Sequence, residues 1–149
     1  LFERCAIRYM EAYGMTETIS QTHVNPPTDL RRQCLGIPTF DTIAHVIDPD
    51  TLTPLGPDQP GEIVVHGPQV MKGYWNRPAE TANVLGADGW LRTGDMGLMD
   101  EQGRFRITDR KKDMIVVSGF KVFPNEVEDV VALHPGVPPI GAGTVAPSL

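Results

Sequence analysis

Short apolar runs separated by turn residues fill the first two thirds of this sequence. Period-two alternation, or a short buried run between Gly and Pro clusters, is typical of β-strands. Strand-sized segments at such short intervals predict a β-barrel-like or sandwich subdomain. The expected strands are Ile7–Ala12, Thr42–Asp48, Glu62–His66, Met96–Met99 and Arg104–Thr108, with a hairpin turn at Asp100–Gly103 joining the last two.

The segments between these strands have different characters. Ile19–Cys34 is polar and contains Pro26-Pro27, so we expect a surface loop. Asn76–Leu85 carries Pro78 at the first turn of a predicted short helix. The aromatic residues of the apolar patch before it, Tyr74 and Trp75, and also Trp90, are interpreted as core.

A second packing unit is predicted after the charged segment Asp109–Asp113, which reads as a linker. Met114–Val117 is a strand candidate, and Pro124 begins a helix whose valines form a buried stripe. These valines are Val127, Val130 and Val131. So few elements cannot bury a core, so we expect this unit to be incomplete. The first residue is Leu, which also suggests a piece of a longer chain.

Composition narrows the possible functions. Hydrophobic residues make up 40% of the chain, which is enough for a core, and the 15 glycines and 14 prolines favour short strands over a helical bundle. The net charge of −6 without a basic stripe argues against nucleic-acid binding. The two cysteines have no metal-binding spacing, which fits a reducing cytosol. The longest aliphatic run, Met114–Val117, is too short to span a bilayer.

Polar residues that suit a binding site cluster at turns. The loop that follows Tyr13 offers the Thr16 hydroxyl and the Glu17 carboxylate at the end of a strand, where ligands bind in open α/β sheets. From spacing alone, an N-cap role for Thr16 or Glu17 is the favoured interpretation. The stretch Trp90–Glu128 adds a Thr-Gly-Asp turn, a basic cluster and a Ser-Gly-Phe-Lys loop.

Four motifs in this order and spacing resemble the adenylate-forming (AMP-binding) acyl-CoA synthetase superfamily, which includes fatty-acyl-CoA ligases, luciferases and peptide-synthetase adenylation domains. They are YGMTE at residues 13–17, GYW at 73–75, WLRTGD at 90–95 and DRKKDMIVVSGFKVFPNEVE at 109–128. The amino-acid sequence of these motifs is most similar to that of bacterial long-chain fatty-acid–CoA ligases. The resemblance implies a mixed α/β fold. Residues 1–108 would be the C-terminal part of the large AMP-binding domain, 109–112 a hinge linker, and 113–149 the truncated start of a small α+β C-terminal domain.

The resemblance implies an enzyme that uses ATP, Mg²⁺ and CoA to activate a fatty acid as acyl-AMP and transfer it to the CoA thiol. It implies a cytoplasmic parent enzyme and allows its peripheral association with the inner membrane face. An aryl-acid–CoA ligase and a carrier-loading adenylation domain are alternatives, because the acyl pocket lies mostly upstream. A non-catalytic β-rich interaction module leaves the motif spacing unexplained.

The resemblance also implies roles for residues that match the family motifs. The Tyr13 ring would stack on adenine, Thr16 would contact the phosphate, and Glu17 would bind Mg²⁺. Gly14 would belong to the same cofactor-binding site. Asp95 would accept hydrogen bonds from the ribose hydroxyls, and Arg110 would meet the ribose or phosphates. On local chemistry alone, Tyr13 also fits a core position and Asp95 a turn former.

Lys112 occupies the family's hinge position, and Ser118, Gly119 and Phe120 would line the pantetheine tunnel. On charge alone, the DRKKD segment also fits a solvated cluster. The family's Gly/Ser/Thr-rich phosphate loop and its C-terminal catalytic lysine are not in this sequence. Since both stabilise phosphate charge, we expect the chain to be inactive by itself.

Overall fold

The computed structural model describes residues 9–110, 115–117, 120–122, 124–132 and 134. The chain divides into two compact units, Leu1–Lys112 and Asp113–Leu149. The first unit is mostly β, and all of its strand pairs are antiparallel.

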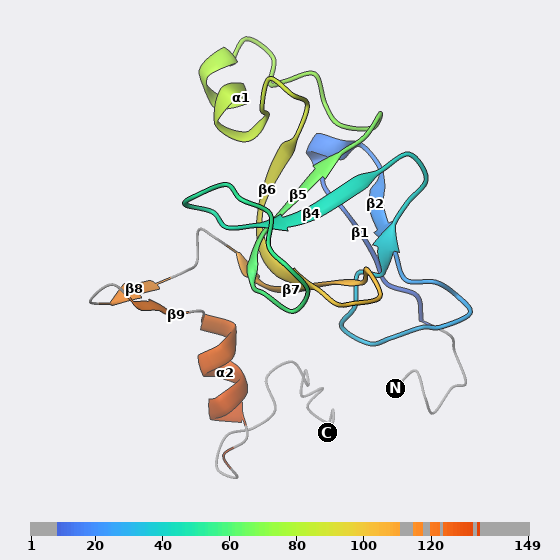
Figure 1. Ribbon diagram of the computed structural model, residues 1–149, viewed down its shortest axis with the longest axis vertical. Coiled ribbons are helices and arrows are strands. Elements are labelled where there is room, and N and C mark those ends of the chain that lie inside the picture. Colours follow the sequence, from blue (N-terminus) through green and yellow to red (C-terminus); the bar gives the residue numbers. More distant parts are fainter. Residues whose placement is uncertain (1–8, 111–114, 118–119, 123, 133, 135–149) are drawn as a thin grey trace, which may run out of the picture. The chain divides into compact units, whose positions relative to one another are not determined.

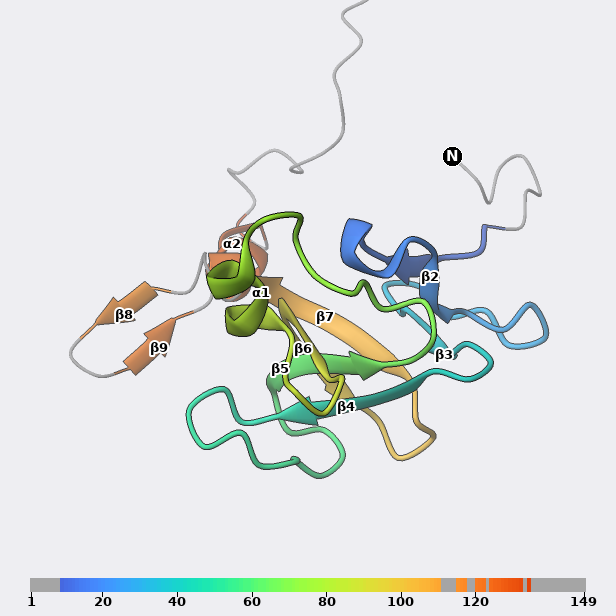
Figure 2. The ribbon, with the colours of Figure 1, turned by 90° about the horizontal axis from the view of Figure 1, so that it is seen from above.

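Two antiparallel sheets make up the first unit (Figures 1 and 2). The smaller sheet has the order β1-β2-β3, and the larger sheet has the order β4-β5-β6-β7. A 3-10 turn, η2 (Thr16–Thr18), joins β1 to β2, and helix α1 (Pro78–Val84) precedes β6. The strands are β1 (Ala12–Gly14), β2 (Gln21–Val24), β3 (Ile37–Pro38), β4 (Ile43–Ile47), β5 (Gly61–His66), β6 (Leu91–Met99) and β7 (Phe105–Arg110).

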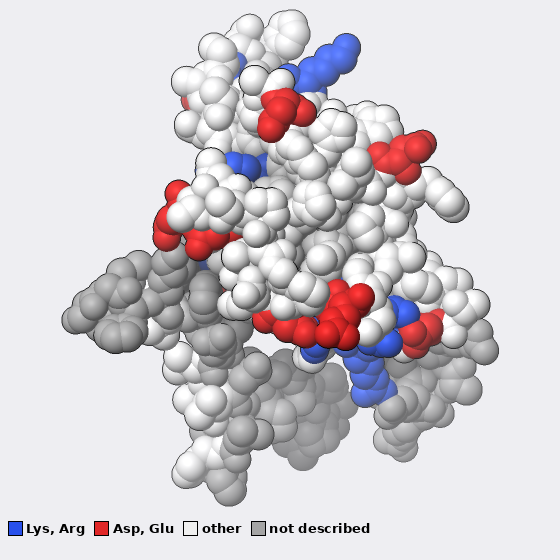
Figure 3. Space-filling view, viewed as in Figure 1, with Lys and Arg blue, Asp and Glu red and all other residues white. Residues whose placement is uncertain are grey.

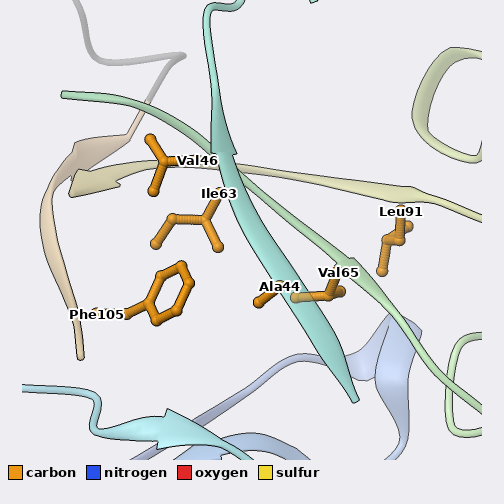
Figure 4. Close-up of a cluster of buried hydrophobic side chains, with 6 residues drawn as sticks. All are labelled: Ala44, Val46, Ile63, Val65, Leu91 and Phe105. Carbon is orange, nitrogen blue, oxygen red and sulfur yellow. The ribbon is translucent and has the colours of Figure 1, made fainter. Parts of the chain in front are cut away.

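The hydrophobic core lies on the larger sheet (Figure 4). It consists of Ala44, Val46, Ile63, Val65, Leu91 and Phe105. Alternate residues of β4 and β5 supply four of these side chains, as the period of two in a strand requires. Full burial of a side chain such as Phe105, which is 1% exposed, stabilises the fold by roughly 1.5–3 kcal/mol.

Phe105 also joins the two sheets. Its backbone N–H donates to Gly36 O at 2.9 Å, and its carbonyl accepts from Leu35 N at 2.8 Å. Its ring lies against the His23 ring of β2, with centroids 4.6 Å apart. A Cβ on Gly36 would lie 2.0 Å from Val24 O, so only glycine allows this close approach.

The structure confirms part of the predicted element pattern and corrects the rest. The helix over Asn76–Leu85 and the hairpin turn at Asp100–Gly103 are present. The predicted surface loop Ile19–Cys34 contains strand β2, which pairs on both sides. The described strands of the first unit form two open sheets and not a closed barrel.

Three strand boundaries also differ from expectation. β1 starts only at Ala12, where the predicted strand was expected to end, and it extends to Gly14. β6 is continuous from Leu91 to Met99, so the Thr-Gly-Asp sequence lies within a strand and not in a turn. β7 extends to Arg110, two residues into the predicted linker.

The second unit contains a hairpin of β8 (Ile115–Val117) and β9 (Phe120–Val122), followed by α2 (Pro124–Ala132). The predicted helix start at Pro124 is confirmed. The predicted buried stripe is wrong, because Val127, Val130 and Val131 are 50%, 69% and 46% exposed.

On the face shown in Figure 3, acidic and basic described residues are interspersed and form no continuous basic surface. Among the described residues, no helix is both long enough and apolar enough to cross a membrane.

Candidate functional site

Two residues from other strands of the first unit contact Asp95. The Tyr13 hydroxyl donates a hydrogen bond to Asp95 Oδ2 at 2.6 Å. The Arg110 guanidinium, at Nε, lies 3.5 Å from Asp95 Oδ1. Tyr13 comes from β1, Asp95 from β6 and Arg110 from the end of β7. The structure therefore brings together three of the residues that the motifs singled out.

An irregularity in β6 positions Asp95. Glu62 pairs with Met96 and Val64 with Arg92, so Thr93, Gly94 and Asp95 lie opposite Ile63 alone. Such a bulge re-aims side chains and interrupts the ladder. Gly94 has a φ of +74°, a conformation that L side chains rarely adopt.

Hydrogen bonds within and across the bulge hold it in place. The Thr93 hydroxyl donates to Ile63 O at 2.7 Å and accepts from Asp95 N at 3.1 Å. The Glu62 carboxylate, 2% exposed, accepts from Gly94 N at 3.3 Å. It also accepts from Arg92 Nη2 at 2.6 Å, so its buried charge is paired.

Strand β2 holds Tyr13 in place beside Asp95. Its ring is 9% exposed and lies near the His23 ring, with centroids 5.7 Å apart. Burial, followed by the hydrogen bond to Asp95, raises the pKa of Tyr13 well above its ordinary value. The hydroxyl therefore remains a proton donor to Asp95 at physiological pH.

The residues after Tyr13 form a tight turn. Thr16 and Glu17 are the first residues of η2, and Met15 precedes them without a side-chain cap. The favoured N-cap role for Thr16 or Glu17 is therefore wrong. Thr18 satisfies the turn instead, because its hydroxyl accepts from Met15 N at 3.1 Å and donates to Ser20 O at 2.9 Å. The Thr16 side chain is left exposed.

Glu17 has a partner that the sequence placed in the core. The Tyr74 hydroxyl donates to Glu17 Oε1 at 2.8 Å. Tyr74 and Trp75 are 37% and 88% exposed, so their interpretation as core is wrong. Trp90 is partly buried and packs between His45 and His66, with ring centroids 5.1 and 5.5 Å away.

The described residues also line two surface hollows. One, of about 550 Å³, is lined by residues of the loop after Tyr13. These residues are Gly14, Met15, Thr16, Ile19, Ser20 and Gln21. The other, of about 670 Å³, lies beside Tyr74 and α1. Asp95 lines neither of them.

The turn η2 offers one carboxylate, that of Glu17, to a divalent metal ion. Within the described residues, no group of three or more His, Cys, Asp or Glu side chains could hold a metal. Mg²⁺ commonly binds through one or two carboxylates together with substrate phosphates. The Glu17 carboxylate, at the start of η2, is compatible with that arrangement.

The remaining predicted site residues belong to the region around the unit boundary. Lys112, Ser118 and Gly119 lie outside the described residues. Phe120 is the first residue of β9. Their predicted hinge and tunnel roles stay predictions.

Sequence reasoning missed four residues that shape this site. They are His23, Glu62, Thr93 and Tyr74. Thr93 and Tyr74 stood inside recognised motifs, which was the available signal. Glu62 and His23 occupy strand positions where a polar residue is buried, and only the strand pairing reveals that burial.

Comparison with known proteins places the chain in a family. The AMP-binding enzyme family matches residues 1–75. A long-chain-fatty-acid–CoA ligase of Escherichia coli O157:H7 is 51% identical over 134 residues, which are 89% of this chain and 24% of the relative. The chain thus spans about a quarter of the length of this curated relative.

Solved structures agree with this assignment. ATP-bound MatB from Rhodopseudomonas palustris has a TM-score of 0.80 and 39% identity, covering 87% of this chain and 26% of its own. O-succinylbenzoate coenzyme A synthetase from Bacillus subtilis, in complex with AMP, has a TM-score of 0.76 and 34% identity, covering 93% and 28%. This chain belongs to the AMP-binding enzyme family.

Proposed function

We propose that this chain is part of an ATP-dependent acid–CoA ligase that activates a fatty acid as acyl-AMP and transfers the acyl group to CoA. The observation that carries the proposal is the convergence of Tyr13 and Arg110 on Asp95. A partly buried carboxylate beside an aromatic ring is suited to a nucleoside, whose ribose offers two hydroxyl donors. Relatives with bound ATP and AMP support the same ligand class.

The proposed reaction has two steps. A carboxylate oxygen of the acid attacks the α-phosphorus of ATP, and pyrophosphate leaves. The thiol sulfur of CoA then attacks the acyl carbon, the thiol loses its proton, and AMP leaves. Asp95 holds the ribose through both steps, while Arg110 offsets the charge of Asp95 or of the phosphates.

In this proposal, Thr16 and Glu17 bind the phosphate end of the nucleotide. The Thr16 hydroxyl is exposed and lines the hollow after Tyr13, where it can donate to a phosphate oxygen. Glu17 would hold Mg²⁺, which neutralises phosphate charge when it is bound. Lys112 would be the hinge between half-reactions, and Ser118, Gly119 and Phe120 would meet the pantetheine of CoA.

Testing the nucleotide site requires the complete enzyme that contains this chain. Asp95→Asn keeps the shape of the side chain but removes its charge. Since hydrogen bonds to charged groups contribute about 1.5–3 kcal/mol, AMP affinity should fall by roughly tenfold or more, measured by calorimetry. Asp58→Asn, at an exposed loop carboxylate, is the control and should change nothing. Equal affinities in both variants would remove Asp95 from the site.

The acid substrate is tested by a pair of acids. A fatty acid is favoured by the 51% identity to a long-chain-fatty-acid–CoA ligase. Palmitate should therefore support faster CoA-dependent AMP release than benzoate. Faster release with benzoate would replace the fatty-acid assignment with an aryl-acid ligase. AMP release without CoA consumption would indicate a carrier-loading domain, and no release with either acid would favour a non-catalytic module.

A further inference from the structure

Tyr74 contacts a predicted site residue although it belongs to a motif without an assigned role. Its hydroxyl donates to Glu17 Oε1 at 2.8 Å, across 57 residues of sequence. Met71, in the same segment, donates its backbone N–H to Glu17 O at 2.7 Å. The segment Met71–Tyr74 therefore holds both the main chain and the side chain of Glu17.

Helix α1 fixes the position of Tyr74. The Tyr74 N–H donates to Thr81 Oγ1 at 2.9 Å, and that hydroxyl donates to Arg77 O at 2.8 Å. A Cβ on Gly73 would lie 2.9 Å from Thr81 Cγ2, and the φ of Gly73 is +145°. Leu85, directly after α1, bridges to the first residue of β6 and packs on the core. Tyr74 is thus connected to the core through an ordered helix.

The chemistry of the pair suits orientation of a carboxylate. The Tyr74 hydroxyl is a hydrogen-bond donor, and its contact of 2.8 Å with Glu17 Oε1 fixes one oxygen of the carboxylate. Each of the two oxygens of a carboxylate can accept a hydrogen bond or coordinate a metal ion. Among the described residues, only Tyr74 is bonded to the Glu17 carboxylate, and it occupies Oε1.

We propose that Tyr74 is a positioning residue, which holds Oε1 of Glu17 so that Oε2 is available to the Mg²⁺ that accompanies ATP. The inference rests on the proposed function and gives the Gly-Tyr-Trp motif a role. Partners of metal-binding carboxylates orient the ligand and raise metal affinity without touching the metal. A tyrosine that only packed would not need its hydroxyl on Glu17.

The test measures metal dependence in the complete enzyme. Tyr74→Phe removes the hydroxyl and keeps the ring. We expect the Mg²⁺ concentration for half-maximal binding of a non-hydrolysable ATP analogue, followed by calorimetry, to rise about tenfold. Binding of Mn²⁺ in the presence of the analogue, followed by electron paramagnetic resonance, should weaken equally. AMP affinity in EDTA should not change, because that complex needs no metal.

Two further variants complete the experiment. Trp75→Phe is the matched control, since Trp75 is the adjacent aromatic residue and is 88% exposed; its Mg²⁺ dependence should equal that of the wild type. In a Glu17→Gln background, Tyr74→Phe should have no additional effect on Mg²⁺ dependence, because the two side chains act as a pair.

The possible failures are distinguishable. If Glu17→Gln shifts the Mg²⁺ dependence and Tyr74→Phe does not, the positioning role is wrong and the ligase assignment stands. An equal loss of AMP affinity in EDTA would mean that Tyr74 only supports the fold, which also overturns the inference. Mg²⁺ dependence that Glu17→Gln leaves unchanged would remove the metal from Glu17 and the inference with it. A wild type that binds no nucleotide would reject the proposed function itself.

Discussion

At the scale of single residues, Asp95 depends on neighbours inside the motifs and on Glu62, which lies outside them. Its carboxylate meets Tyr13 and Arg110, but its backbone is fixed by the Thr93 hydroxyl. The buried Glu62 in turn holds Gly94 next to it. Hydrogen bonds to buried charged groups are costly to leave unmade, so these supporting residues control the geometry of the site.

Removal of the Tyr13 hydroxyl tests whether its hydrogen bond holds the Asp95 carboxylate in place. Tyr13→Phe keeps the ring that β2 packs against and removes the bond to Asp95 Oδ2. We expect a loss of about 1 kcal/mol in the free energy of unfolding, measured by urea denaturation. AMP affinity should fall less than in Asp95→Asn, because the ring and the carboxylate remain. An affinity loss as large as that of Asp95→Asn would contradict a supporting role for the hydroxyl.

His23 makes stability depend on pH. Burial lowers the pKa of His23 to about 4, and its Nε2 has no hydrogen-bond partner in the described residues. The unfolded state, with a pKa near 6.5, takes up a proton first as pH falls. The stability contributed by neutral His23 is therefore complete above about pH 6.5 and is lost progressively as pH falls toward about 4.

His23→Phe should remove this dependence. Between pH 6.5 and 5, the wild type should lose roughly 2 kcal/mol more stability than the variant, because a shift of one pKa unit corresponds to 1.36 kcal/mol. Thermal unfolding across this pH range measures the difference. His45→Gln, at an exposed histidine of β4, is the control and should keep the wild-type profile. Parallel profiles for wild type and His23→Phe would contradict the prediction.

At the scale of secondary structure, the bulge in β6 is the feature that creates the site. A regular strand would place Thr93, Gly94 and Asp95 on alternating faces and pair each with β5. The observed pairing leaves all three opposite Ile63. The positive φ of Gly94 and the side-chain bonds of Thr93 and Glu62 make the irregularity a built feature.

Two glycines with the same backbone angle test the bulge. Gly94 and Gly103 both have a φ of +74°, and a Cβ would meet nothing within 4 Å at either position. Alanine at each should therefore cost about 1 kcal/mol of stability through backbone strain alone. Only Gly94→Ala should weaken AMP binding by calorimetry, because only it moves Asp95. An equal effect of both variants on AMP affinity would contradict the role of the bulge.

Strand β2 shows why one element escaped sequence reasoning. Its central residues Thr22 and His23 are polar but buried, at 1% and 0% exposure. Hydropathy assigns such residues to the surface, whereas the Thr22 hydroxyl bonds to Tyr13 O and to the His23 ring. The bond to Tyr13 O reaches the neighbouring strand β1, and a local pattern cannot contain such a partner.

At the scale of the whole molecule, the chain consists of two units whose boundary falls at Lys112–Asp113. The predicted hinge is at the same place in the sequence, although Lys112 lies outside the described residues. Within the second unit, the apolar face of α2 is exposed at three valines. Each unit thus has its own character, with a packed core described only in the first.

The hinge prediction is kinetic. In the complete enzyme, Lys112→Pro should spare acyl-AMP formation and slow thioester formation, because proline fixes φ where the hinge must rotate. Single-turnover assays of the two half-reactions measure this split. Lys112→Ala removes the charge but leaves φ free, and it should leave both half-reactions near wild-type rates. Equal losses in both half-reactions for Lys112→Pro would argue against a hinge there.

The sequence by itself determined the family, the hairpin turn at Asp100–Gly103 and the helix starts at Pro78 and Pro124. The turn and the two helix starts are local features, since turn residues and the fixed φ of proline act within a few residues. The tertiary structure decided which residues surround Asp95 and Glu17. Tyr13 and Asp95 are 82 residues apart, and Glu17 and Tyr74 are 57 apart, so only the packing of strands and α1 brings them together. Their hydrogen bonds form across elements, and the site is therefore a property of the fold.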